Sequence, residues 1–253
     1  MYINLSGLNV LVTGASRGIG KAIASKLAEA GATIAVHYNK NMREAENLAH
    51  VLGNESRAFQ ADLSQPDDAA NLFDRVILEM GSIEILVNNA GVAIPADIDA
   101  KESDWINSWN TNIQVNLTSS GILCKKIIEH FLKRNSAGRI INISSRAAFR
   151  GDTAEYMAYA ASKAGLVALT RTIARAYGKQ GIKAFNIAPG FVKTDMAIGI
   201  MEKYGTEHAS SDIALERMTE PKDIAPLVTF LASGMADHAT GSTIDVNAGS
   251  YVH

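Results

Sequence analysis

The amino-acid sequence predicts an α/β fold, a doubly wound parallel sheet with helices on both faces. Three observations predict this fold class. Apolar strand patterns alternate with helical patterns from end to end, a glycine-rich turn joins the first strand directly to a helix, and polar residues follow several strands. Because parallel strands need a crossover connection, helices between successive strands favour a parallel sheet.

The first strand, turn and helix are the most specific of these elements. An apolar strand that starts at Leu8 ends at Thr13-Gly14, and residues 21–30 predict a helix that ends at Gly31. Free N–H groups and the positive end of the helix dipole favour an anion there, and glycines let it approach. A second strand follows at 32–37. We therefore expect a dinucleotide-binding, Rossmann-type unit rather than an ordinary tight turn.

The remaining elements continue the alternation. A substrate-binding loop, rather than a disordered segment, is expected around residues 190–220, which are rich in Gly, Met, Thr and Ser. Strands are expected at 56–60, 84–88, 139–143, 183–187 and 243–246, and helices at 42–52, 67–80, within 102–134, at 158–177 and at 221–232.

Composition favours one soluble domain covering 1–253. The chain has 253 residues, 47% of them apolar, and no Pro-rich, Ser-rich or charged linker. Its formal charge is −2, from 24 basic and 26 acidic residues, so we expect no nucleic-acid or membrane partner. The lone Cys124 has no disulfide partner and no nearby Cys or His for a metal site. Without a leader or a membrane-spanning run, a cytoplasmic location is expected.

Tyr159 and Lys163 are four residues apart on the helix expected at 158–177. This spacing puts both side chains on one helix face, where an ammonium can lower the pKa of a phenol. Tyr156 has no cation at the same spacing. A packed ring beside a solvated lysine is the common alternative for such a pair.

Polar or conformationally special residues also follow the later strands. Asn88-Asn-Ala-Gly91, Ser144-Ser145 and Ala188-Pro-Gly190 each come at a strand end. Ligands of doubly wound sheets bind beyond the carboxyl ends of the strands, so we expect these segments to meet in one site.

Together these motifs make the chain closely resemble the short-chain dehydrogenase/reductase family in its compact single-domain form. The resemblance extends from Gly7 to about Gly249, and the order of the motifs makes it specific. It is carried by Thr13-Gly-Ala-Ser-Arg-Gly-Ile-Gly20, Asp62-Leu63, Asn88-Asn-Ala-Gly91, Asn116, Ser145, Tyr159-Ala-Ala-Ser-Lys163, and Pro189-Gly190 followed by Thr194.

The resemblance implies a catalytic set. Tyr159 would exchange a proton with the carbonyl or alcohol oxygen, and Lys163 would lower the phenol pKa and hold the nicotinamide ribose. Ser145 would stabilise the developing alkoxide, and Asn116 would bind a water that relays protons toward Lys163. Ser144 is the alternative to Ser145, but strand alternation is expected to point it to the opposite face.

The resemblance also implies a nicotinamide cofactor, for which we favour NADP(H), with NAD(H) as the alternative. After the second strand no acid occurs before Glu44, whereas Lys40 and Arg17 could bind a 2′-phosphate. Asp62 is expected to contact the adenine. The implied cofactor-binding residues are Thr13, Gly14, Ser16, Arg17, Gly18, Ile19, Gly20, Asn39, Lys40, Asp62, Leu63, Asn89, Ala90, Gly91, Tyr159, Lys163, Pro189, Gly190, Val192 and Thr194.

The substrate stays open. A ketone or 3-oxoacyl-acyl-carrier-protein reductase is expected first; an NAD(P)-dependent sugar, polyol or cyclic-alcohol dehydrogenase and a cofactor-binding regulatory protein without turnover are the alternatives. Arg146 and Arg150 would favour an anionic substrate or a phosphopantetheine arm if they face the pocket, although surface charges are the slightly preferred interpretation. The family implies a homotetramer, with a homodimer as the alternative. Asn247 and Ala248 depart from the Asp-Gly-Gly turn of many relatives, at a place where subunits often meet.

Overall fold

The computed structural model describes residues 3–195, 197 and 212–252. In this part of the chain, seven parallel strands form one sheet in the order β3-β2-β1-β4-β5-β6-β7. The doubly wound α/β prediction is therefore confirmed. The strands are β1 (Asn9–Val12), β2 (Thr33–Tyr38), β3 (Arg57–Gln60), β4 (Ile85–Asn88), β5 (Gly138–Ile143), β6 (Ile182–Pro189) and β7 (Thr243–Val246).

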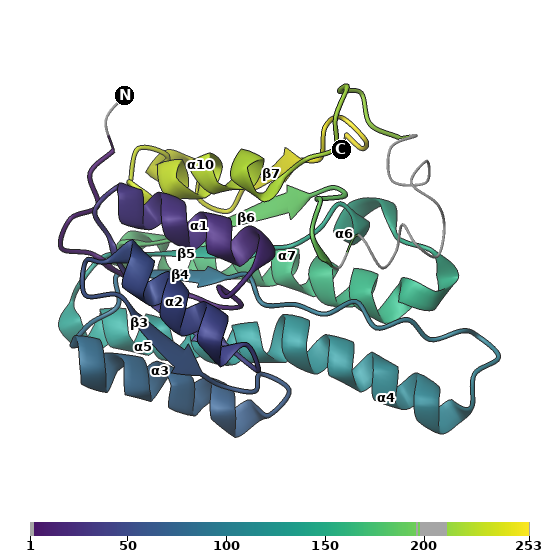
Figure 1. Ribbon diagram of the computed structural model, residues 1–253. Helices are drawn as coiled ribbons and strands as arrows, with labels where there is room; N and C mark the ends of the chain where they lie inside the picture. Colours follow the sequence, from purple (N-terminus) through teal and green to yellow (C-terminus); the bar gives the residue numbers. More distant parts are fainter. Residues whose placement is uncertain (1–2, 196, 198–211, 253) are drawn as a thin grey trace.

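Helices cover both faces of the sheet (Figure 1). One face is covered by α1 (Gly18–Glu29), α2 (Met42–Leu52) and α10 (Pro221–Ala232). The other is covered by α3 (Pro66–Met80), α5 (Ser119–Arg134) and α7 (Met157–Tyr177), with α4 (Glu102–Ile113) beside α7. Short elements complete the described chain: α6 (Ala147–Arg150), η2 (Ala154–Tyr156), η3 (Gly178–Gln180) and η4 (Asp237–Ala239).

Strand alternation explains the two cores. Val10 and Val12 of β1 pack into the core under α1, α2 and α10, whereas Leu11 between them packs into the core on the other face. All three are fully buried. A strand that is covered on both faces needs a continuous apolar run, and Val10, Leu11 and Val12 form such a run in β1.

The helical stretch predicted within 102–134 is interrupted. Residues Gln114–Thr118 form a π-helical turn, η1, between α4 and α5. Such single π-helical turns inside an α-helix are frequently found at functional sites. Here the turn contains the buried Asn116.

The predicted substrate loop at 190–220 lies partly outside the described residues. Within the described part, Val192 and Thr219 form a parallel bridge, and Lys193 N–H donates to the Thr219 carbonyl at 2.9 Å. The two ends of the loop are therefore held together beyond the end of β6. The single-domain assignment stays a prediction.

Candidate functional site

The glycine turn, residues 13–20, connects β1 to α1 at the point where the strand order reverses between β1 and β4. Gly14 and Gly18 have φ values of +63° and +56°, which side chains rarely adopt. At Gly20, an added Cβ would collide with the Gly14 carbonyl oxygen and lie 2.5 Å from Asn89 Nδ2. The turn therefore needs glycine at these positions, and it leaves the backbone open beside the N-terminus of a 12-residue helix.

Thr13 and Asn89 hold the turn against the end of β4. The Thr13 hydroxyl accepts hydrogen bonds from the backbone N–H groups of Asn89 and Ala90, at 2.9 and 3.0 Å. Asn89 Nδ2 in turn donates to the carbonyls of Thr13 and Gly14, at 2.9 and 3.2 Å. The Thr13 side chain thus binds the backbone that follows β4, and the Asn89 side chain binds the backbone of the glycine turn. These bonds hold the two segments of the site together.

His37, at the penultimate position of β2, is a third support that the sequence analysis missed. Its Nδ1 accepts from the Gly14 N–H at 2.9 Å, and Nε2 lies 3.2 Å from the Ala61 carbonyl oxygen, to which it can donate as the neutral ring. Burial lowers the pKa of His37 to about 4, so the ring is neutral near pH 7. A lone histidine in a strand carries no pattern that would have revealed this role.

The side chains expected at the ribose end of a dinucleotide lie beyond β2 and β3. Asn39 and Lys40 are exposed, and Asn39 Nδ2 donates to Asp62 Oδ1 at 3.3 Å. The Ser64 N–H also donates to Asp62, at 3.0 Å, and lowers the pKa of this carboxyl. Leu63 is buried. Arg17 is exposed and forms an ion pair with Asp195 at 3.0 Å, which links the glycine turn to the segment after β6.

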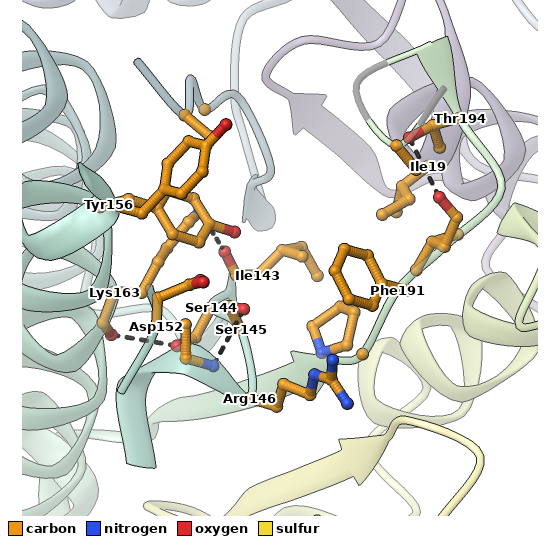
Figure 2. Close-up of a pocket in the computed structure, with 18 of the residues that line it drawn as sticks. Ile19, Ile143, Ser144, Ser145, Arg146, Asp152, Tyr156, Lys163, Phe191 and Thr194 are labelled. Atoms are coloured by element: carbon orange, nitrogen blue, oxygen red, sulfur yellow. Dashed lines mark hydrogen bonds between the residues drawn. The ribbon is translucent and has the colours of Figure 1, made fainter. Parts of the chain in front are cut away.

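Ser145, Tyr159 and Lys163 line one pocket beyond β5 and β6. Figure 2 shows this pocket, with Ser145 and Lys163 labelled. The Ser145 side chain acts on the Tyr159 phenol and tends to lower its pKa, which links the two candidate reacting groups. Lys163 Nζ donates to the Ile143 carbonyl at 2.9 Å and lies 5.8 Å from the centroid of the Tyr159 ring. Ser144 is not free for the same role, since its hydroxyl donates to the Lys163 carbonyl at 3.0 Å.

Burial dominates the pKa values of this group. Desolvation raises the pKa of the Tyr159 phenol, and the hydrogen bond with Ser145 opposes this shift. Desolvation also lowers the pKa of the Lys163 ammonium to about 8. Lys163 is not among the groups that shift the phenol pKa in this arrangement, so the expectation that it lowers this pKa stays a prediction.

Asn116 uses its side chain to hold the loop after β4. Its Oδ1 accepts from the Val92 N–H at 2.8 Å, and its Nδ2 donates to the Val92 carbonyl and to Ser162 Oγ, both at 2.9 Å. Ser162 Oγ donates to the Tyr159 carbonyl at 2.7 Å. Asn116 therefore reaches the catalytic helix through Ser162, a residue that the sequence analysis did not single out.

Arg146 departs from the sequence-based preference for a surface charge. Its side chain is 6% exposed and lines the pocket with Arg150 and Asp152. The reason is local: Arg146 directly follows Ser145, and its N–H donates to the Pro189 carbonyl at 2.9 Å, which holds its backbone at the sheet edge. Arg150 is partly exposed and binds Asp212 at 2.9 Å.

The structure brings many of the predicted residues together. Those that line the pocket with Tyr159 are Ile19, Asn89, Gly91, Ser145, Lys163, Pro189, Gly190, Val192 and Thr194. Asn116 lies in η1 and is not one of the lining residues. The other predicted residues lie along the ends of β1–β4: Thr13, Gly14, Ser16, Arg17, Gly18, Gly20, Asn39, Lys40, Asp62, Leu63 and Ala90. Among the described residues, no His, Cys, Asp or Glu group is arranged to hold a metal, and no helix is long and apolar enough to span a membrane.

Known proteins resemble this chain over nearly its whole length. Residues 14–251 match the family model described as enoyl-(acyl carrier protein) reductase. A 3-oxoacyl-acyl-carrier-protein reductase from Staphylococcus epidermidis is 36% identical, over 96% of this chain and 99% of the relative.

Two solved structures are similar in fold and length. A Beutenbergia cavernae protein with bound NADP, named as an NAD(P)-dependent gluconate 5-dehydrogenase, has a TM-score of 0.90 and 29% identity, covering 99% of both chains. A short-chain dehydrogenase from Burkholderia cenocepacia in complex with NADP has a TM-score of 0.88 and 31% identity, covering 98% and 99% of the two chains.

Proposed function

This chain belongs to the short-chain dehydrogenase/reductase family of enzymes, and we propose that it interconverts a ketone and a secondary alcohol with NADP(H), favouring reduction. One observation carries the proposal. Ser145 directly follows the end of β5, and Tyr159 and Lys163 come from α7, yet all three line one pocket.

The chain's own residues divide the acid–base work. The raised pKa of Tyr159 keeps the phenol protonated near neutral pH, ready to protonate a carbonyl oxygen. Ser145 donates a hydrogen bond to the same oxygen as negative charge develops. Lys163 binds the ribose hydroxyls, and Asn116 takes part in proton relay through a water. When bound, NADP(H) supplies or accepts the hydride.

The residues around the glycine turn fit NADP(H). The turn requires glycine where a pyrophosphate would approach, and α1 begins directly behind it. Lys40 and Arg17 are exposed on the ribose side, and the sequence has no carboxylate from 37 to 43 to accept a 2′-hydroxyl. We infer that Arg17 and Lys40 bind the 2′-phosphate. The NADP found in two similar structures supports this choice.

Two substrate classes follow from different observations. A 3-oxoacyl thioester is favoured by the name of the Staphylococcus epidermidis relative. A polar hydroxy acid or polyol is favoured by the charged pocket lining, Arg146, Arg150 and Asp152, and by the gluconate dehydrogenase neighbour. We further propose a cytoplasmic homotetramer; light scattering of the purified enzyme checks its assembly, and a dimer or monomer mass would contradict it.

The test is absorbance-monitored oxidation of NADPH and NADH against 3-oxoacyl thioesters, diketones, quinones and keto sugars. We expect turnover with NADPH, reduced about 100-fold or more in Tyr159→Phe while NADPH binding is retained. Tyr177→Phe, at the other end of α7, is the matched control and should keep full activity. Unchanged activity in Tyr159→Phe would contradict the assigned role, and tight NADPH binding without any turnover would favour a regulatory protein.

A further inference from the structure

Arg146 is a buried cation beside the reacting groups. Its side chain is 6% exposed, and its guanidinium carbon lies 4.8 Å from the centroid of the Phe191 ring. Figure 2 shows Arg146 and Phe191 at the same edge of the pocket that holds Ser145 and Asp152. A guanidinium packed on an aromatic face is fixed in orientation, which favours recognition of a planar group.

The guanidinium has unused donor capacity. Its Nη1 is buried without a hydrogen-bond partner. Asp212 Oδ2 lies 3.5 Å from this nitrogen but accepts a hydrogen bond from Arg150 Nη1 at 2.9 Å. Buried donors are normally satisfied, since leaving one without an acceptor costs free energy. A ligand oxygen in the pocket would supply the missing acceptor.

We propose that Arg146, supported by Arg150, binds a carboxylate of the substrate, so that this enzyme acts on an oxo acid and the corresponding hydroxy acid. The inference rests on the proposed function and specifies its substrate class. A carboxylate is planar and accepts two parallel hydrogen bonds from the guanidinium fork. A neutral ketone offers no group of this geometry.

The position of Arg146 favours a carboxylate over the phosphate of a pantetheine arm. Arg146 adjoins Ser145 in sequence and lines the same pocket, so an anion that it binds lies in the pocket that holds the reacting groups. In an acyl-carrier thioester, the phosphate is separated from the 3-oxo group by the whole length of the arm. A short oxo acid carries its carboxylate within a few bonds of the ketone.

Asp152 makes this binding depend on pH. It lines the pocket, and Arg146, Arg150 and Glu155 act on its carboxyl together with the Thr153 N–H, which donates to it at 2.9 Å. Desolvation raises the pKa of Asp152 above its usual value. A bound carboxylate would raise it further by like-charge repulsion, so protonation of Asp152 as pH falls would favour the bound acid. The acid substrate should therefore bind more tightly as pH falls.

The test compares two pairs of substrates that differ mainly in charge and a third pair that differs by the phosphate-bearing arm. Acetoacetate is paired with acetoacetamide, levulinate with levulinamide, and acetoacetyl-CoA with the acetoacetyl thioester of N-acetylcysteamine. We expect kcat/KM to favour one of the acids over its amide by about 10- to 100-fold, the range for a hydrogen bond to a charged group. Arg146→Gln should remove this preference through a higher KM, while Arg175→Gln, an exposed arginine of α7, should retain it.

Two further variants keep the test decisive if Arg146→Gln folds poorly. Arg150→Gln should reduce the acid preference by a smaller factor, because Arg150 is partly exposed. Asp152→Asn should change it in the opposite direction, lowering KM for the acid and removing its dependence on pH. Quenching of bound NADPH fluorescence by acid and amide gives the same comparison without turnover.

Each outcome separates this inference from the proposed function. Tyr159-dependent turnover without an acid preference, or a preference that survives in Arg146→Gln, would overturn the inference and leave the reductase in place. An advantage of the coenzyme A thioester that disappears in Arg146→Gln would assign the arginine to the arm phosphate and also overturn it. Arg146-dependent binding of the acid without turnover would support the carboxylate site and contradict the proposed reaction.

Discussion

The glycine turn at 13–20 and the segment after β5, residues 144–153, both follow a central strand, yet they prepare their sites differently. In the first, backbone groups, small side chains and the neutral His37 satisfy one another, as with Thr13 and Asn89. In the second, Arg146, Arg150 and Asp152 line one pocket, Asp212 from outside the segment pairs with both arginines, and Arg146 Nη1 is buried without a hydrogen bond.

This difference separates the features that recognise a common cofactor group from those that recognise a particular substrate. A pyrophosphate is recognised by backbone N–H groups and a helix dipole, which many side chains can flank. A particular substrate is recognised by side chains placed for it, and an unsatisfied donor is where such recognition becomes visible. We therefore expect changes in the glycine turn to affect cofactor binding, and changes in the segment after β5 to affect substrate choice.

Gly20→Ala should have the largest effect. The added methyl would collide with the Gly14 carbonyl and with Asn89, so we expect the Kd for NADPH to rise about 100-fold and the free energy of unfolding to fall by about 1–3 kcal/mol. Isothermal titration and urea unfolding measure both quantities.

Gly121→Ala is the matched control. A Cβ at this position of α5 meets nothing within 4 Å, so stability should stay unchanged or rise by up to about 1 kcal/mol. Normal NADPH binding by Gly20→Ala would contradict the inference that position 20 needs glycine in order to pack against Gly14 and Asn89.

His37 should make stability depend on pH. Its folded pKa of about 4 is below the ordinary value of 6.5, so the unfolded chain takes up the proton first. Its linkage contribution is constant above pH 6.5 and falls as pH drops from 6.5 toward 4. Between pH 7.5 and 5 we expect this group to cost about 2 kcal/mol of unfolding free energy.

Urea unfolding of wild type and His37→Gln across this range checks the prediction. The variant should be less stable near neutral pH, because the Gly14 N–H loses its acceptor, and its stability should vary less with pH. Parallel pH curves for the two proteins would show that His37 is not the group responsible.

Arg17→Gln should weaken NADPH about 10-fold and leave NADH unchanged, because it removes a cation from the 2′-phosphate. Stability should change by less than about 1 kcal/mol, since Arg17 and Asp195 are 67% and 69% exposed. Cofactor titration measures both affinities, with Lys26→Gln, an exposed lysine of α1, as control. Equal weakening of both cofactors would assign Arg17 to the turn instead.

Asp152→Asn should have the smallest effect on cofactor binding and a distinct effect on catalysis. The Asp152 charge raises the pKa of Tyr159, so its removal should lower that pKa. In the oxidation direction, where the phenolate accepts a proton, the rising limb of the kcat profile should move to lower pH. Asp67→Asn, exposed on α3, is the control, and an unshifted limb would contradict the coupling.

Local patterns predicted most of the fold. Alternating apolar runs marked the strands, and glycines marked the turn between β1 and α1, because both features depend on neighbours in the chain. The split of the 102–134 helix was not predictable in the same way. The π-helical turn contains Asn116, whose side chain binds Val92, a contact between distant residues.

The functional site likewise contains residues that local patterns predicted and residues that they did not. The i,i+4 spacing of Tyr159 and Lys163 put both residues on one helix face, and the family motifs indicated Ser145 and the cofactor residues. His37 and Ser162 were missed because each acts through one hydrogen bond to a segment that the sequence does not bring near. Burial raises the pKa of Tyr159, a shift that the spacing of Tyr159 and Lys163 could not predict, because burial depends on everything that encloses the ring.

The sequence by itself determined the order of strands and helices, the glycine turn and the spacing of Tyr159 and Lys163, since all of these are set by residues close together in the chain. Tertiary structure alone decided that Arg146 is buried beside Ser145. Phe191 and Asp212, which flank its guanidinium, lie far along the chain, and only the parallel pairing of β5 with β6 brings the Phe191 segment to the pocket. Burial and the missing hydrogen-bond partner are properties of that assembled surface.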